Sequence, residues 1–334
     1  MERNLIFKGK NKIFLAITIF LIVNILLTGI AIAKTPSYLW ATGGFGGRPY
    51  VSAGAAAHYL NRGSFGEMYR LSIQPSAGTV ENVRRMERGE IDIANIDSHI
   101  FFWYQLPSLN WNERYVNSRA VMRAYTASFP LVTLERSGIK TFNDMIGKRV
   151  SLGPIGSGNS AVATEVVRAL GLYDKIDATN HPWNQGPEEL ADGRVDVCLS
   201  STVPTGYLEE LSTTHQIVWV GLSKEEESIV IEKLPFFPTG WVPAVHGVKE
   251  EVRGMTISSW IFAHKDVPED VIYNLLKHFI TEEGLEYGGS VTPVWKEWTI
   301  EKALDGLPIP LHPGAEKFWR EIGVEIPKPL DDLK

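Results

Sequence analysis

The sequence predicts an α/β fold of two lobes joined by a two-strand hinge, and three observations lead to this prediction. Short apolar runs alternate with helical patterns from about residue 37 to residue 330, which is typical of α/β proteins whose sheets are mostly parallel. Two segments repeat one another in residue type and order, as two similar lobes would. Stretches rich in proline and glycine mark two points where the chain would cross between the lobes.

The apolar runs are expected to form strands. Several of them are nearly continuous, as in strands that helices cover on both faces. We expect strands at residues 38–41, 69–73, 91–96, 131–134, 149–152, 195–199, 217–220 and 260–263. Helical patterns lie between these runs, so the two sheets should be mostly parallel.

The internal repeat consists of residues 89–93 and 193–197. Each segment reads glycine, charged residue, aliphatic residue, aspartate, aliphatic residue. The glycine suits the C-terminus of a helix, where a left-handed conformation is common, and the aliphatic residues would begin a strand. We interpret Asp92 and Asp196 as structural residues at the entrances of two strands.

The two crossing segments define the lobe boundaries. One lies at residues 128–130 and the other extends from Pro235 to Gly254. The first lobe would contain residues 37–129 and 256–334, and the second lobe residues 130–255. A lobe made from two separate parts of the chain needs two crossings, and two crossings form a hinge.

A secretory signal is predicted at residues 1–33. A basic segment precedes an apolar run from residue 13 to residue 30, which closes with the small-residue pattern Ala31-Ile32-Ala33. We expect cleavage after Ala33 and export of the mature chain to the periplasm. The apolar run is long enough to span a bilayer, so an uncleaved anchor is the alternative. No cysteine lies near the cleavage point, so we do not expect a lipoprotein with an anchor on an N-terminal cysteine.

The composition limits the classes of partner. The formal net charge is −6 at pH 7, and removal of the basic leader would make the chain more acidic. This charge argues against nucleic acid and anionic membrane surfaces as partners. It also means that any selectivity for an anion must be local. The single cysteine, Cys198, lies in an apolar run and is expected to be a buried small hydrophobe.

Three turns that contain glycine follow predicted strands and precede predicted helices, at residues 42–49, 76–79 and 153–160. Free N–H groups at the positive end of a helix dipole can bind an anion. In open α/β sheets such turns lie at the carboxyl ends of strands, where ligands collect. A small carboxylate bound between the turns would contact both lobes and hold them closed. Ordinary helix capping is the alternative for each turn.

A few side chains near these turns could contact a ligand. The guanidinium of Arg48, at the end of the first turn, could bind a carboxylate through two hydrogen bonds. A solvated arginine is the alternative, although a cation at a helix start opposes the dipole. Trp183 could form an apolar wall or pack in the core. Asp97 follows a strand and could bind an amino or hydroxyl group, whereas His99 is expected to be a polar loop residue.

With these residues in place, the chain resembles the TAXI family of TRAP-transporter solute receptors over about residues 37–330. The resemblance is carried by residues 42–47, 74–82, 89–94, 137–140, 147–154, 156–158 and 311–315. It implies a type II periplasmic-binding fold. It also implies that the protein captures a small carboxylate or amino acid, such as glutamate or 2-oxoglutarate, and delivers it to an ion-coupled TRAP permease.

The predicted ligand-binding residues combine the resemblance with the residue arguments above. They are Gly44, Phe45, Gly46, Arg48, Tyr50, Ser76, Ala77, Gly78, Thr79, Asp97, Gly156, Ser157, Gly158, Asn159, Ser160 and Trp183. The chain departs from the family at Arg48 and Pro49, where other members commonly have an aliphatic residue and a tyrosine. Arg48 would suit a second carboxylate or a sulfonate.

The sequence favours a binding protein over an enzyme. It contains no Gly-x-Ser-x-Gly elbow, no phosphate-binding loop and no histidine pair at metal-ligand spacing, so no catalytic residue, cofactor or metal is expected. A sensory partner of a membrane receptor is one alternative, and an enzyme on the same fold is the other. We expect a monomer without a nucleic-acid partner.

Overall fold

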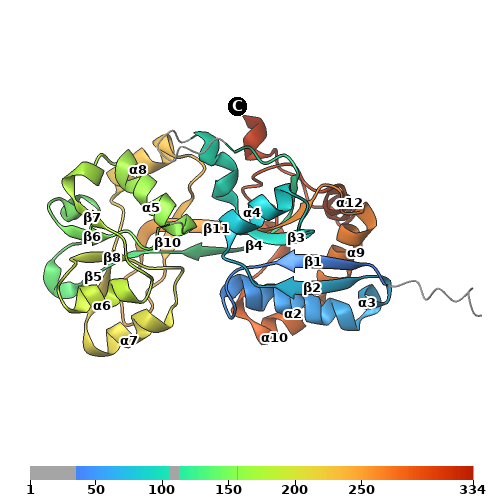
Figure 1. The fold of residues 1–334 in the computed structure, drawn as a ribbon, viewed down its shortest axis with the longest axis horizontal. Coiled ribbons are helices and arrows are strands. Elements are labelled where there is room, and N and C mark those ends of the chain that lie inside the picture. Colours follow the sequence, from blue (N-terminus) through green and yellow to red (C-terminus); the bar gives the residue numbers. More distant parts are fainter. Residues whose placement is uncertain (1–34, 106–112, 156, 334) are drawn as a thin grey trace, which may run out of the picture. The chain divides into compact units, whose positions relative to one another are not determined.

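The structure is a computed structural model that describes residues 35–105, 113–155 and 157–333. The predicted secretory signal at residues 1–33 lies outside the described residues. The chain from Ser37 onward forms one compact unit. In this unit two sheets, each packed against helices, form two lobes (Figure 1).

The first sheet contains six strands. They are β1 (Ser37–Ala41), β2 (Arg70–Gln74), β3 (Ile93–Asp97), β4 (Ser118–Ser128), β10 (Thr239–Val242) and β11 (Val252–His264). β1 lies between β2 and β3 and is parallel to both. β11 is antiparallel to β3, β4 and β10.

The second sheet contains five strands in the order β7-β6-β8-β5-β9. They are β5 (Leu131–Leu134), β6 (Arg149–Ser151), β7 (Asp177–Thr179), β8 (Val197–Leu199) and β9 (Ile217–Val220). β6 is parallel to β7 and β8, and β5 is antiparallel to β8 and β9.

Helices connect the strands of both sheets. Between β1 and β4 lie α2 (Arg48–Arg62), α3 (Ser64–Met68), α4 (Thr79–Glu87) and η1 (Ser98–Gln105). After β11 follow α9 (Glu269–Phe279), α10 (Glu282–Val291), α11 (Pro293–Lys296), η6 (Ile300–Lys302), α12 (Pro313–Glu321) and η7 (Leu330–Leu333). Those between β5 and β10 are η3 (Glu135–Ser137), η4 (Asn143–Met145), α5 (Gly158–Ala169), η5 (Tyr173–Lys175), α6 (Gln185–Ala191), α7 (Gly206–Thr214) and α8 (Lys224–Lys233).

Each sheet contains one inserted strand, which the chain forms directly after it crosses from the other sheet. β5 follows β4 directly and enters the second sheet, and β11 returns to the first sheet after the last strand of the second. In both sheets a parallel trio is followed by this inserted strand; β9 lies beyond β5 in the second sheet, and both β4 and β10 pair with β11 in the first. This is the type II periplasmic-binding fold. The sheets are mixed rather than mostly parallel, because each inserted strand is antiparallel to its neighbours.

Every strand expected from an apolar run is present, with shifts at the ends, which confirms that part of the prediction. The run at residues 260–263 is the last part of the longer β11. β4, β7 and β10 were not predicted, because they lack a continuous apolar run. The lobe boundaries stay a prediction; β10, inside the predicted second lobe, pairs with β11 of the first sheet.

The internal repeat positions one pair of parallel strands in each sheet. The Asp92 carboxylate accepts a hydrogen bond of 2.7 Å from the N–H of Leu39, and the Asp196 carboxylate accepts one of 2.9 Å from the N–H of Arg149. The N–H of each aspartate donates back to the carbonyl of the same partner. The glycines that begin the two segments both have φ of +69°. The interpretation of both aspartates as structural residues is therefore confirmed.

The cores are apolar and dense with aromatic rings. Trp40, Trp260 and Trp319 are fully buried in the core of the first sheet. Cys198 of β8 is fully buried, as expected, and burial raises the pKa of its thiol to about 12. Within the described ranges, we find no helix with the length and hydropathy that a membrane crossing requires.

The structural role of Asp92 can be tested by measuring the stability of the folded protein. We expect Asp92→Ala to lower the free energy of unfolding by about 1.5–3 kcal/mol, because it removes a hydrogen bond from a backbone N–H to a charged acceptor. Asp92→Asn, which keeps an acceptor oxygen, should lose less than half as much free energy of unfolding as Asp92→Ala. Urea denaturation measures both, and equal losses in the two variants would contradict a role for the acceptor.

Candidate functional site

The first two glycine turns meet at the carboxyl ends of β1 and β2. The N–H of Ser76 donates to the carbonyl of Gly43 at 3.1 Å, and its hydroxyl donates to the carbonyl of Thr42 at 3.1 Å. Beneath them, the amide of Asn82 on α4 donates to the carbonyls of Thr42 and Asn95. The two turns are therefore held together as one edge of the first sheet.

The first turn presents its tip to solvent. The N–H of Gly47 donates to the carbonyl of Gly44 at 2.9 Å, and Gly46 has φ of +74°, a conformation that favours glycine. The ring of Phe45 is 82% exposed and lies 4.9 Å from the ring of Tyr50. Gly44, Phe45, Gly46 and Tyr50 are thus brought together at this tip.

In the second turn, nearby side chains already accept hydrogen bonds from the backbone N–H groups. The N–H of Gly78 donates to the Ser76 hydroxyl at 3.1 Å, and the N–H of Ala77 donates to the Glu81 carboxylate at 2.8 Å. An anion at this helix start would meet the charge of Glu81. The Thr79 hydroxyl, in turn, donates to the Asp97 carboxylate at 2.9 Å, which joins this turn to the end of β3.

A polar cluster extends from Asp97 toward the second lobe. Ser259 of β11 pairs in register with both Asp97 and Tyr125, and its side chain hydrogen-bonds with both of theirs. The guanidinium carbon of Arg48 lies 5.4 Å from the centre of the Tyr125 ring. Arg48 also donates to the carbonyl of Val203, which follows β8 of the second sheet, at 3.0 Å. Arg48 therefore contacts elements of both lobes.

Burial controls the charges in this cluster. It raises the pKa of Asp97 to about 6, although hydrogen bonds from Thr79 and Ser259 oppose the rise. Burial and the nearby Asp97 charge raise the pKa of Tyr125, while Arg48 lowers it. Tyr125 is thus a neutral hydroxyl at physiological pH, and Asp97 titrates just below neutrality.

The third turn begins α5 in the second lobe. The Ser157 hydroxyl accepts a hydrogen bond of 3.2 Å from the N–H of Ser160 and so caps the helix. The ring of Trp183 lies against Gly153, where an added Cβ would come within 2.9 Å of it. Gly153 also has φ of +79°, so glycine is required there on both grounds. Gly156 lies outside the described residues.

The third turn approaches the first lobe at His99. An added Cβ on Gly158 would lie 3.4 Å from Nε2 of His99. His99 is not the polar loop residue that the sequence suggested: it lies in η1 and is 2% exposed. Burial lowers the pKa of its imidazole to about 3, so the ring is neutral at physiological pH. Asn159 follows Gly158 at the same helix start and is half-buried.

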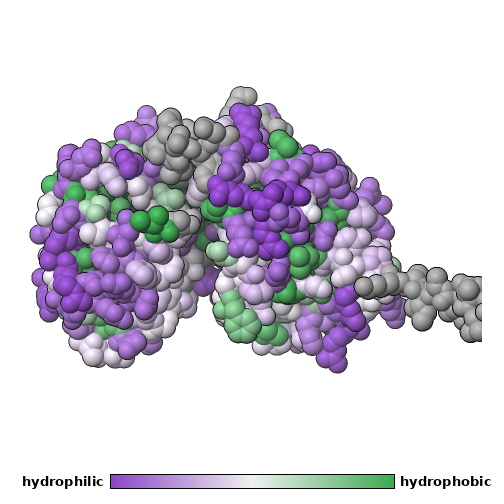
Figure 2. Space-filling view, in the orientation of Figure 1, coloured by the Kyte–Doolittle hydropathy of each residue, from purple (hydrophilic) through white to green (hydrophobic). Residues whose placement is uncertain are grey.

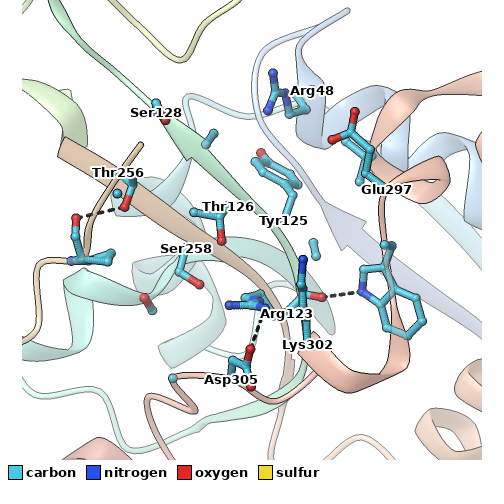
Figure 3. Close-up of a pocket in the computed structure, with 18 of the residues that line it drawn as sticks. Arg48, Arg123, Tyr125, Thr126, Ser128, Thr256, Ser258, Glu297, Lys302 and Asp305 are labelled. Atoms are coloured by element: carbon cyan, nitrogen blue, oxygen red, sulfur yellow. Dashed lines mark hydrogen bonds and ion pairs between the residues drawn. The ribbon is translucent and has the colours of Figure 1, made fainter. Parts of the chain in front are cut away.

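A cavity of about 1300 Å³ begins at Arg48 and follows β4 (Figure 3). Arg48 and Tyr125 lie at one end, and Arg123, Lys302 and Asp305 lie together at the other. Further lining comes from Thr126, Ser128, Ser258, Phe236, Trp241, Glu297 and Trp298. The surface is visibly hollowed between the two lobes (Figure 2). Of the described residues predicted to bind ligand, Arg48 lines this cavity and the others lie outside its lining.

Tyr125 and Ser259 were not among the expected residues, because the sequence pattern does not predict β4 and predicts only the end of β11. One signal was available: Arg123 and Tyr125 are two residues apart and so occupy one face of an extended segment. In the structure Arg123 pairs with Asp305 at 3.2 Å. Among the described residues, no cluster of three histidine, cysteine or acidic side chains could hold a metal ion.

Comparisons with known proteins give a family and several similar structures. Residues 40–323 match the NMT1-like family, and the chain belongs to this family. The periplasmic aliphatic sulphonate binding protein SsuA from Escherichia coli is 12% identical, with 78% of this chain and 82% of that one covered and a TM-score of 0.46. The extracellular-binding protein of a probable amino-acid ABC transporter from Bacillus subtilis is 12% identical, with coverage of 77% and 97% and a TM-score of 0.45.

A third solved structure, the ligand-binding core of GluR0 in complex with L-glutamate, is 9% identical to this chain. The alignment covers 78% of this chain and 98% of that one, with a TM-score of 0.44.

The raised pKa of Asp97 predicts a pH-dependent stability. Between pH 3.8 and about 6 the folded protein holds a proton on Asp97 that the unfolded chain has released, so the free energy of unfolding falls as the pH rises. The side-chain amide of an Asp97→Asn variant does not titrate. We therefore expect the wild type to lose about 1–3 kcal/mol relative to this variant between pH 4 and pH 7.

Urea denaturation of both proteins at pH 4, 5.5 and 7 measures this difference. Asp144→Asn is the control, because backbone N–H groups of Thr141 and Lys140 lower the pKa of Asp144 below its ordinary value of 3.8. The stability change of that group is then nearly complete below pH 4, so the difference between the wild type and Asp144→Asn should stay nearly constant from pH 4 to pH 7. A constant difference between the wild type and Asp97→Asn would contradict the raised pKa.

Proposed function

We propose that this protein is an exported solute receptor that binds a small acid between its two lobes and delivers it to a TRAP-type permease. The proposal is carried by the surroundings of Arg48. Its guanidinium has five N–H donors, and it contacts one carbonyl oxygen and one aromatic ring. Within the described part of the chain, no carboxylate forms an ion pair with it, so an anionic solute would supply the missing countercharge.

The position of Arg48 links binding to closure. Its side chain starts from α2 of the first lobe and bonds to Val203, next to the strands of the second. An anion bound to Arg48 would therefore lie where the two lobes already contact one another. A solute that interacts more favourably with the closed arrangement shifts the population toward it, and the permease would recognise that closed form.

The polar groups around Arg48 favour a small carboxylate, of the glutamate or 2-oxoglutarate kind, or a sulfonate. A guanidinium binds the planar oxygens of a carboxylate through two parallel hydrogen bonds. Asp97, Tyr125 and Ser259 add a carboxylate and two hydroxyls that suit an amino or hydroxyl substituent of the solute. The permease, the periplasmic location and the monomeric state rest on the resemblance to TAXI receptors and on the leader sequence.

Removal of the guanidinium tests this proposal. We expect Arg48→Ala to weaken binding of the preferred acid by about 2–4 kcal/mol, because a desolvated charge pair is lost. Titration of the tryptophan fluorescence with 2-oxoglutarate, L-glutamate and propane-1-sulfonate measures this change.

Arg62→Ala is the matched control, since Arg62 lies in the last turn of the same helix and bonds to exposed His58. It should leave the affinity unchanged. If the wild type binds none of these acids, the receptor proposal is wrong. If Arg48→Ala binds as tightly as the wild type, a different residue anchors the acid.

A further inference from the structure

We propose that His99 is a specificity-determining residue of the same site, whose Nε2–H donates to an oxygen of the bound acid at the start of α5. This inference rests on the proposed function and adds a second contact for the solute, at the third glycine turn. It assigns the solute to acids that carry a second oxygen-bearing group.

The Nε2 atom of His99 is a buried polar atom that lacks a hydrogen-bond partner in the described part of the chain. Buried polar groups in folded proteins are nearly always paired, so such an atom calls for an explanation. The ring is held in place by two aromatic neighbours, since its centre lies 5.5 Å from that of Trp103 and 5.9 Å from that of Phe237. The imidazole is thus packed against two rings, with Nε2 unpaired among the described residues.

That nitrogen is directed at the N-terminus of a long helix. Gly158 is the first residue of the 12-residue helix α5, and an added Cβ there would lie 3.4 Å from Nε2 and 3.8 Å from Cε1 of His99. The hydroxyl of Ser157 accepts the N–H of Ser160, and the first backbone bond of the helix is donated by Ala161. The N–H groups of the first two helical residues, which precede Ser160, have no acceptor within the helix and suit an oxygen acceptor.

The groups at His99 and the start of α5 favour a solute that has an oxygen atom at this position. Burial lowers the pKa of His99 to about 3, so the ring is neutral, and in the tautomer that carries its proton on Nε2 it donates a hydrogen bond without a charge. An acid with a second carboxylate or a keto oxygen would pair with Nε2 and the helix N–H groups together. A solute without that oxygen would leave the buried donor unpaired, and sites of this kind discriminate strongly against such analogues.

The experiment compares two dicarboxylic acids, 2-oxoglutarate and L-glutamate, with pentanoate, which has one carboxylate and an alkyl tail. Calorimetric titration gives the dissociation constant of each. We expect His99→Leu to weaken the tighter of the two dicarboxylic acids at least about tenfold, and to change the constant for pentanoate much less. His99→Gln, whose side-chain amide offers an N–H donor, should recover most of the affinity.

A second pair of variants leaves His99 unchanged. Gly158→Ala would place a methyl group against Nε2, where the solute oxygen is expected, and should weaken the same acid at least about tenfold. Gly206→Ala is the matched control, because Gly206 is the first residue of α7 and its added Cβ would meet nothing within 4 Å. Alanine favours a helix over glycine in both places, so neither change should lower the melting temperature.

The outcomes separate the two proposals. If the wild type binds neither dicarboxylic acid, the role of His99 is overturned, and the receptor proposal then stands only if propane-1-sulfonate binds. If Arg48→Ala weakens binding while His99→Leu and Gly158→Ala do not, the receptor stands and the role of His99 is overturned. Equal losses for pentanoate and the dicarboxylic acids in His99→Leu would mean a structural role only, which also overturns the inference.

Discussion

The exchange of one strand between the two sheets is the constraint on which the rest of the structure depends. β5 lies inside the second sheet immediately after the chain leaves β4, and β11 lies inside the first sheet after the chain returns. Each inserted strand has a neighbour on both sides, so its loss would divide a sheet. The chain therefore crosses between the lobes next to strands that lie inside the sheets, and Tyr125 and Ser259 belong to two such strands, β4 and β11.

The polar groups of the candidate site follow from this arrangement. The repeated aspartates Asp92 and Asp196 fix the parallel strands on which the glycine turns are built. The turns then emerge at the carboxyl ends of strands, and Arg48 and His99 extend from the first lobe toward the second. A solute at this point would contact both lobes, so its binding energy would act directly on their arrangement.

Much of this fold could be predicted from local patterns, because strands buried on both faces require continuous aliphatic runs. Glycine turns were also visible, since left-handed φ values at Gly46, Gly78 and Gly153 favour glycine. β4 could not be predicted this way, because it carries Arg119 and Arg123 and is stabilised by pairing with the distant β11. The second turn, which caps itself, did leave a signal: an acidic residue at the third position of a helix often bonds back to the N–H groups before it. His99 Nε2, which is unpaired among the residues that the structure describes, left no such signal, because its surroundings are side-chain positions that only the folded chain defines.

Cys198 is the single cysteine of the chain and is buried inside the second lobe, with a thiol pKa raised to about 12. Its reactivity toward maleimides should be negligible, since the thiolate is the nucleophile. Spin labels or fluorophores attached to introduced surface cysteines could then track the separation of the lobes in an otherwise native background.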